Sequence, residues 1–143
     1  MDREAITRYL RESFAGIVPV AAWGETSFFY NPEKRLPRGV ERDGEHDQAS
    51  ALWRPEVFRL NIGISATTYR SLFGALPARP TAGGVIEGGH DFTTIDRLMP
   101  HPVYGWMGWI SVLNPSAATF DLVKPLLVEA HGLAVRKFEK RIR

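Results

Sequence analysis

Residues 54–74 read RPEVFRLNIGISATTYRSLFG, and this stretch decides the fold class. At 57–62 apolar side chains alternate with polar ones, which is the period of a half-buried β-strand. Ser65 and Gly74 then enclose an apolar run with helical spacing, as an N-cap residue and a glycine after the last turn enclose a short helix. A strand followed directly by a helix indicates a domain that mixes both kinds of structure.

The chain before this stretch predicts a helix and a hairpin. Asp2 is placed to cap a helix over residues 3–14, whose apolar side chains recur at helical spacing. Strands at 18–23 and 26–30 follow, separated by two residues, which is the length of a hairpin turn.

Two segments are predicted to be loops. Residues 31–52 contain two prolines, two glycines and many charged residues, and residues 75–90 are also rich in proline and glycine. A structureless segment as long as the first is unusual in a compact domain and tends to be functional or mobile. Since residues 38–50 contain little that can be buried, we expect them to be among the most mobile in the chain.

The second half of the chain predicts further helices and one clear strand. Asp91 is placed to cap a short helix that Pro100 ends, and residues 109–113 form the strand. Ser116 begins another helix. Pro125 lacks an N–H and clashes with the preceding turn, so it is expected to divide this helix into two pieces.

These elements predict an α+β fold, with an antiparallel sheet covered on one face by the N- and C-terminal helices. The length of 143 residues is typical of one domain, so residues 1–143 are expected to form a single domain. The predicted core combines alternating strand residues with the apolar stripe of the last helix: Phe58, Leu60, Ile62, Ile110, Val112, Leu126, Leu133 and Phe138.

Composition removes several classes of function. The chain has no cysteine, which excludes thiol catalysis, zinc fingers and disulfide scaffolds. Its N-terminus carries charges where a signal peptide needs an apolar run, and no stretch is apolar enough for a transmembrane helix. We therefore expect a cytoplasmic protein with no membrane partner, and no motif predicts a cofactor or a metal ion.

Positive charge gathers at the C-terminus, although the net charge is only +2. Five of the last eight residues are lysine or arginine: Arg136, Lys137, Lys140, Arg141 and Arg143. Such a cluster could contact phosphates, but cations also suit the negative end of a helix dipole. The solvated helix end is favoured, and weak nucleic-acid binding through this helix stays as an alternative.

Arg59 and Asn61 are the first candidate site. A spacing of two residues puts both side chains on one face of the predicted strand, where a guanidinium and an amide can hold a carboxylate or a phosphate. The alternative is an ordinary surface face on which Arg59 pairs with Glu56, Glu87 or Asp91.

His101, Tyr104 and Trp53 complete the candidate residues. Two prolines fix the backbone of His101, which precedes Tyr104 by three residues and is placed for acid–base work. No nucleophile or carboxylate stands at a spacing that completes a triad, so a structural histidine is favoured. Trp53 is the tryptophan expected to be partly exposed, where an indole can stack on a planar ligand.

Three segments carry a resemblance to a known family: residues 54–74, the block DFTTIDRLMPHPVYGWMGWISVLNPS at 91–116 and the ending VKPLLVEAHGLAVRKFEKR at 123–141. They resemble a bacterial family called domain of unknown function 6194. More distantly, the layout resembles the YjbR-type domains, which implies a compact α+β fold. The resemblance implies no catalytic residues. Relatives carry an additional apolar strand where Val40 here passes directly to Glu41.

The sequence thus favours a non-catalytic module that binds a small anionic ligand or a protein partner through Arg59, Asn61 and the two loops. An enzyme that uses His101, Tyr104 and Arg59 is the second hypothesis. The third is the weak nucleic-acid binder.

Overall fold

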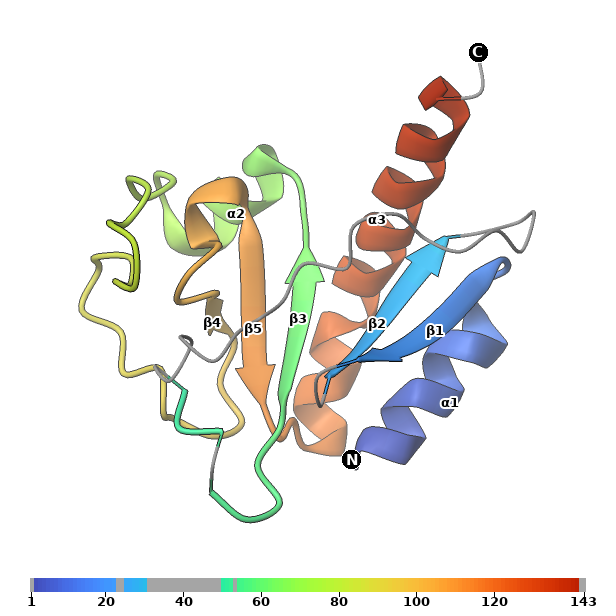
Figure 1. Cartoon of the computed structure of the whole chain (residues 1–143), viewed down its shortest axis with the longest axis horizontal. Coiled ribbons are helices and arrows are strands. Elements are labelled where there is room, and N and C mark those ends of the chain that lie inside the picture. Colours follow the sequence, from blue (N-terminus) through green and yellow to red (C-terminus); the bar gives the residue numbers. More distant parts are fainter. Residues whose placement is uncertain (1, 23–24, 31–49, 53, 142–143) are drawn as a thin grey trace.

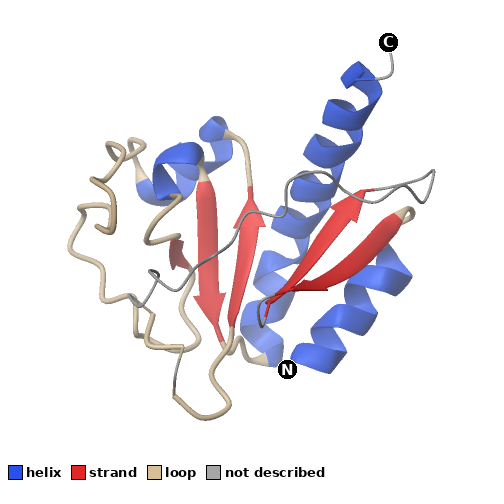
Figure 2. Cartoon of the chain, viewed as in Figure 1, coloured by secondary structure: helices blue, strands red, loops and turns tan. Residues whose placement is uncertain are grey.

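The computed structural model describes residues 2–22, 25–30, 50–52 and 54–141. Figures 1 and 2 show the elements in chain order: α1 (Arg3–Ser13), β1 (Ile17–Ala22), β2 (Glu25–Tyr30), β3 (Arg59–Gly63), α2 (Ala66–Phe73), β4 (Met99–Pro100), the 3₁₀ turn η1 (Gly105–Met107), β5 (Trp109–Leu113) and α3 (Ala117–Arg141). The predicted α+β class is confirmed. The loop at 75–90 contains no helix or strand, as predicted, whereas Trp53 and most of the 31–52 loop lie outside the described residues.

The described strands form two antiparallel sheets. β1 and β2 make a hairpin, and the central sheet has the order β3-β5-β4. The strand predicted at 57–62 begins at Arg59, because the backbone of Phe58 instead bonds to Asn114. Within the described residues no ladder joins the two sheets, so β2 and β3 each have one unpaired edge. Figure 1 shows α1 and α3 on the same side of the strands.

The main core lies between the central sheet and the two terminal helices. The register pairs Leu60 with Val112 and Ile62 with Ile110, so these four side chains share one face. The buried cluster on that face consists of Ile6, Leu10, Ile62, Ile64, Tyr69, Ile110, Phe120, Val123 and Leu127, with Phe58, Leu60 and Leu126 partly buried against it.

Leu133 and Phe138 lie outside this cluster, contrary to the prediction. Both are half-buried, and Phe138 packs edge-on against Tyr30 of β2, with ring centroids 5.5 Å apart. Leu133 and Phe138 lie outside the cluster because α3 is longer than the strands of the central sheet. A helix of 25 residues spans about 37 Å, whereas strands of five residues span about 17 Å. The second half of α3 therefore extends past the central sheet (Figure 1).

Three helix caps predicted from the sequence are confirmed. The Asp2 carboxylate accepts a hydrogen bond from the Ala5 N–H at 2.8 Å, and the Ser65 hydroxyl accepts one from the Thr68 N–H at 3.2 Å. Gly74 ends α2 with a φ of 88°, a left-handed value that favours glycine.

The helix predicted after Asp91 is wrong. The Asp91 Oδ1 accepts hydrogen bonds from the Thr93 N–H and hydroxyl, at 3.0 and 2.6 Å, which closes a turn. Ile95 then pairs with Leu113 of β5. Pairing with a strand that is distant in sequence replaces the helical hydrogen bonds in this segment.

The division of the last helix at Pro125 is also wrong. Ser116 caps the helix as predicted, through a hydrogen bond from the Thr119 N–H at 3.2 Å, but α3 then continues through Pro125 to Arg141. Pro125 is exposed, and the buried Val123 and Leu127 anchor the helix on both sides of it. Burial of these side chains offsets the hydrogen bond that the proline removes.

Candidate functional site

Arg59 and Asn61 lie on the face of the central sheet that points away from the main core. Their side chains contact each other as the two-residue spacing predicted, since the Arg59 Nε donates a hydrogen bond to the Asn61 Oδ1 at 2.9 Å. The Arg59 Nη1 also donates to the hydroxyl of the buried Ser50 at 3.0 Å. Two bonds from different nitrogens thus orient the plane of the guanidinium.

His101 and Tyr104 meet in the turn that leads into η1. The side chain of His101 is only 1% exposed, and its Nδ1 accepts hydrogen bonds from the N–H groups of Val103 and Tyr104 at 3.1 and 3.0 Å. A ring nitrogen that accepts carries no proton, so the neutral ring has its proton on Nε2. The two rings also pack together, with centroids 5.1 Å apart. These bonds support the structural interpretation of His101.

The same sheet face carries residues that the sequence analysis did not single out. Ser111 is opposite Asn61, and the exposed Trp109 is opposite Gly63. A Cβ on Gly63 would lie 3.1 Å from the Trp109 ring, so the indole covers this glycine closely. The alternation of Trp109, Ser111 and Leu113 along β5 is the sequence signal that predicts their shared face.

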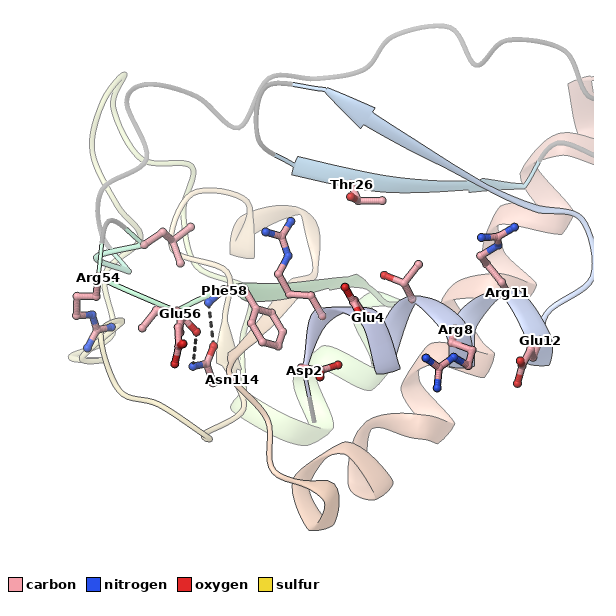
Figure 3. A pocket seen from close by; sticks show the side chains of 14 residues that line it. Asp2, Glu4, Arg8, Arg11, Glu12, Thr26, Arg54, Glu56, Phe58 and Asn114 are labelled. Carbon is pink, nitrogen blue, oxygen red and sulfur yellow. Dashed lines mark hydrogen bonds between the residues drawn. The ribbon is translucent and has the colours of Figure 1, made fainter.

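A separate groove of about 1470 Å³ lies between α1, β2 and the segment that precedes β3 (Figure 3). Its lining contains four arginines and four carboxylates, so the opposite charges balance. The charged lining residues are Arg3, Arg8, Arg11, Arg54, Asp2, Glu4, Glu12 and Glu56, and the others are Leu52, Val57, Phe58, Thr7, Thr26 and Asn114.

One wall of the groove is the segment that precedes β3, and side-chain hydrogen bonds to the backbone hold this segment in place. The Asn114 Oδ1 accepts from the Phe58 N–H at 2.8 Å, and the Asn114 Nδ2 donates to the Glu56 carbonyl at 3.0 Å (Figure 3). The Arg54 Nη2 donates to the Ser50 and Thr93 carbonyls at 3.1 and 2.9 Å. The wall is therefore tied both to the end of β5 and to the loop before β4.

The opposite wall presents a strand edge. Pro19 of β1 is opposite Phe28 of β2 and has no N–H, so this pair cannot exchange two hydrogen bonds. By the alternation of an antiparallel ladder, the N–H and C=O of Phe28 and of Thr26 then point away from β1. Thr26 is exposed and lines the groove across from α1 (Figure 3).

Of the predicted site residues that the structure describes, which are Arg59, Asn61, His101 and Tyr104, none lines this groove. Its walls come from segments far apart in the sequence, and the charged side of α1 reads as an ordinary solvated helix face. Only the register of the hairpin and the three-dimensional arrangement of the segments reveal it.

The described part of the chain has no helix long and apolar enough to cross a membrane. It also holds no group of three or more histidine or acidic side chains that could bind a metal ion.

The comparison with protein families assigns the chain to a family. The model of the family of unknown function DUF6194 matches residues 1–143, so the chain belongs to that family. No curated protein and no solved structure matches the chain.

Proposed function

We propose that this protein is a non-catalytic binding module that holds an extended segment of a partner protein in the groove between α1 and β2. The edge of β2 at Thr26, which no described strand pairs with and which lies beside that groove, carries the proposal. An extended peptide adds to an unpaired strand edge through main-chain hydrogen bonds, while pockets beside the edge select its side chains.

The size and charge of the groove support a peptide rather than a compact ligand. Pockets for small molecules hold roughly 300–1000 Å³, and this groove is larger, at about 1470 Å³. Its balanced charges suit a segment that carries both acidic and basic side chains, since each finds an opposite partner. Leu52, Val57 and Phe58 add apolar surface for an aliphatic or aromatic side chain.

A backbone substitution tests this proposal. Peptides selected from a random displayed library would be measured against the wild type by fluorescence anisotropy. Thr26→Pro removes the N–H that points into the groove, and Pro19 shows that this hairpin accepts a proline at an outward-facing position. We expect Thr26→Pro to weaken binding about tenfold or more, which is about 1.4 kcal/mol and the scale of one or two hydrogen bonds.

Thr26→Val is the matched control, because it changes the side chain and keeps the N–H. Wild-type affinity is expected for this variant. Equal binding by Thr26→Pro, or a library that yields no binder, would overturn the proposal.

A small anion at Arg59 is the second candidate function. The orientation of the guanidinium by Asn61 and Ser50 supports it, because a fixed planar fork matches a carboxylate or phosphate with two hydrogen bonds. Thermal-shift measurements with phosphate and with simple carboxylates test it. A stabilisation lost in Arg59→Ala supports the site, whereas one lost only on deletion of residues 136–143 assigns binding to the basic tail.

The resemblance to YjbR-type domains, the bacterial origin and the cytoplasmic location belong to the same proposal. The first is supported by the order of the sequence segments, the second by the resemblance to a bacterial family, and the third by the absence of cysteine. A partner peptide is then expected to belong to an intracellular protein, whose cysteines are kept reduced.

A further inference from the structure

The outer face of α3 is unusually apolar. Leu122 is 75% exposed and Val128 is 59% exposed, and these are the two most exposed large apolar side chains that the structure describes. Pro125 lies between them and is also exposed. Residues spaced by three share one face of a helix, so the three side chains form a stripe opposite the buried Val123 and Leu127.

Gly132 continues this stripe, and no contact among the described residues calls for a glycine there. A glycine inside a helix costs about 1 kcal/mol relative to alanine. Among the residues that the structure describes, a Cβ at Gly132 would meet only the Arg136 guanidinium, at 3.7 Å, which is an ordinary contact. Packing among the described residues therefore does not require a glycine here, whereas the close approach of a second helix does.

We propose that two copies of this chain associate through the outer faces of α3, antiparallel, about a two-fold axis between Val128 and Glu129. Pro125 and Gly132 are equally far from this axis, so the proline ring of one copy lies over the glycine of the other. Val128 is next to the axis and meets its own counterpart. A bulky residue against a glycine lets the two backbones approach closely.

Charge complementarity supports a second copy rather than another partner. Asp121 and Arg136 are also equally far from the axis, so the antiparallel arrangement places each beside the opposite charge of the other copy, twice by symmetry. Both residues are exposed, and Asp121 already binds Lys124 at 2.8 Å. A parallel arrangement would place Arg136 beside Arg136. The exposed charge pairs contribute little affinity and set the register of the helices.

Sedimentation velocity over a range of protein concentrations tests this inference. The wild type is expected to shift from monomer to dimer as the concentration rises. Val128→Glu replaces the two apolar side chains beside the axis with carboxylates, next to the Glu129 carboxylates already there, and is expected to give a monomer throughout. Leu72→Glu is the control, because Leu72 is a 42% exposed leucine on α2, and this variant is expected to dimerise like the wild type.

Two further variants separate the interface from a loss of folding. Gly132→Leu is expected to abolish the dimer while the unfolding midpoint of dilute monomer stays the same or rises, because leucine favours a helix. Asp121→Arg and Arg136→Asp should each weaken the dimer, and the double variant should restore it. A wild type that is monomeric at every concentration, or a dimer that survives both Val128→Glu and Gly132→Leu, would overturn the inference. The interface uses no residue of the groove, so the test of the dimer does not depend on whether a peptide binds there.

Discussion

His101 holds the turn before η1 through two hydrogen bonds to one ring nitrogen. His101→Ala leaves two N–H groups of a partly buried turn without an acceptor, and we expect it to lower the free energy of unfolding by at least about 2 kcal/mol. His101→Asn keeps an acceptor oxygen near the position of Nδ1 and should cost less. Urea unfolding of both variants measures the difference. Equal losses would assign the role of His101 to ring packing.

Asp96 is expected to make folding stability depend on pH. The Ser116 N–H donates a hydrogen bond to the Asp96 carboxylate at 2.7 Å. This bond, and to a smaller extent a hydrogen bond from the Thr119 hydroxyl, holds the pKa of Asp96 below its ordinary value. A depressed pKa adds stability above the unfolded-state pKa of about 3.8, and this stability is lost as the pH falls through the folded-state value.

Comparison with Asp96→Asn measures that contribution. The wild type should be more stable than Asp96→Asn at about pH 7, and the difference should be smaller at about pH 2. Urea unfolding at both pH values gives the two differences. Glu87→Gln, at an exposed carboxylate with no described hydrogen bond, is the control and should show no such change. A difference that is equally large at low pH would show that the asparagine itself, and not the lost charge, destabilises the protein.

At the scale of elements, α3 keeps a proline in its interior. Pro125 lacks the N–H that would bond to the Asp121 carbonyl, and proline costs up to about 3 kcal/mol in a helix. Pro125→Ala is expected to raise the free energy of unfolding of dilute protein by about 1–3 kcal/mol, measured by urea unfolding. A decrease would mean that the second half of α3 packs on β2 only because the proline bends the helix.

The elements that the sequence predicted correctly have local signals. α1 and α2 have their own capping residues, and β5 has a compact apolar run between turn residues. The segment after Asp91 was assigned wrongly because its hydrogen bonds are long-range, as in the bond from the Asp96 N–H to the Leu113 carbonyl at 2.7 Å.

The candidate site likewise has one part that the local sequence predicts and one part that it does not. The contact between Arg59 and Asn61 follows from the two-residue period of one strand, which is local information. The groove could not be predicted, because Thr26, Phe58 and the charged face of α1 come together only when the two sheets take their places around the terminal helices.

At the scale of the whole molecule, the described residues attach the hairpin to the rest of the fold through side chains and not through a shared ladder. Tyr30 of β2 packs edge-on against Phe138 and His131 of α3, with ring centroids 5.5 and 5.6 Å apart, and Phe28 lies against the main core. An isolated two-stranded hairpin is marginally stable at best. The hairpin should therefore open before the central sheet does.

Phe138→Ala tests this order of opening. It removes a ring that contacts β2 but lies outside the main core, so amide exchange is expected to accelerate in β1 and β2 while β3 and β5 keep wild-type protection. Phe120→Ala is the matched control. Phe120 is 1% exposed within the main core, and its truncation should cost about 3–5 kcal/mol and accelerate exchange in both sheets. If Phe138→Ala also accelerated exchange uniformly, the hairpin and the central sheet would unfold as one cooperative unit. The strand edge beside the groove would then be as rigid as the core, and a partner peptide would meet a preformed site.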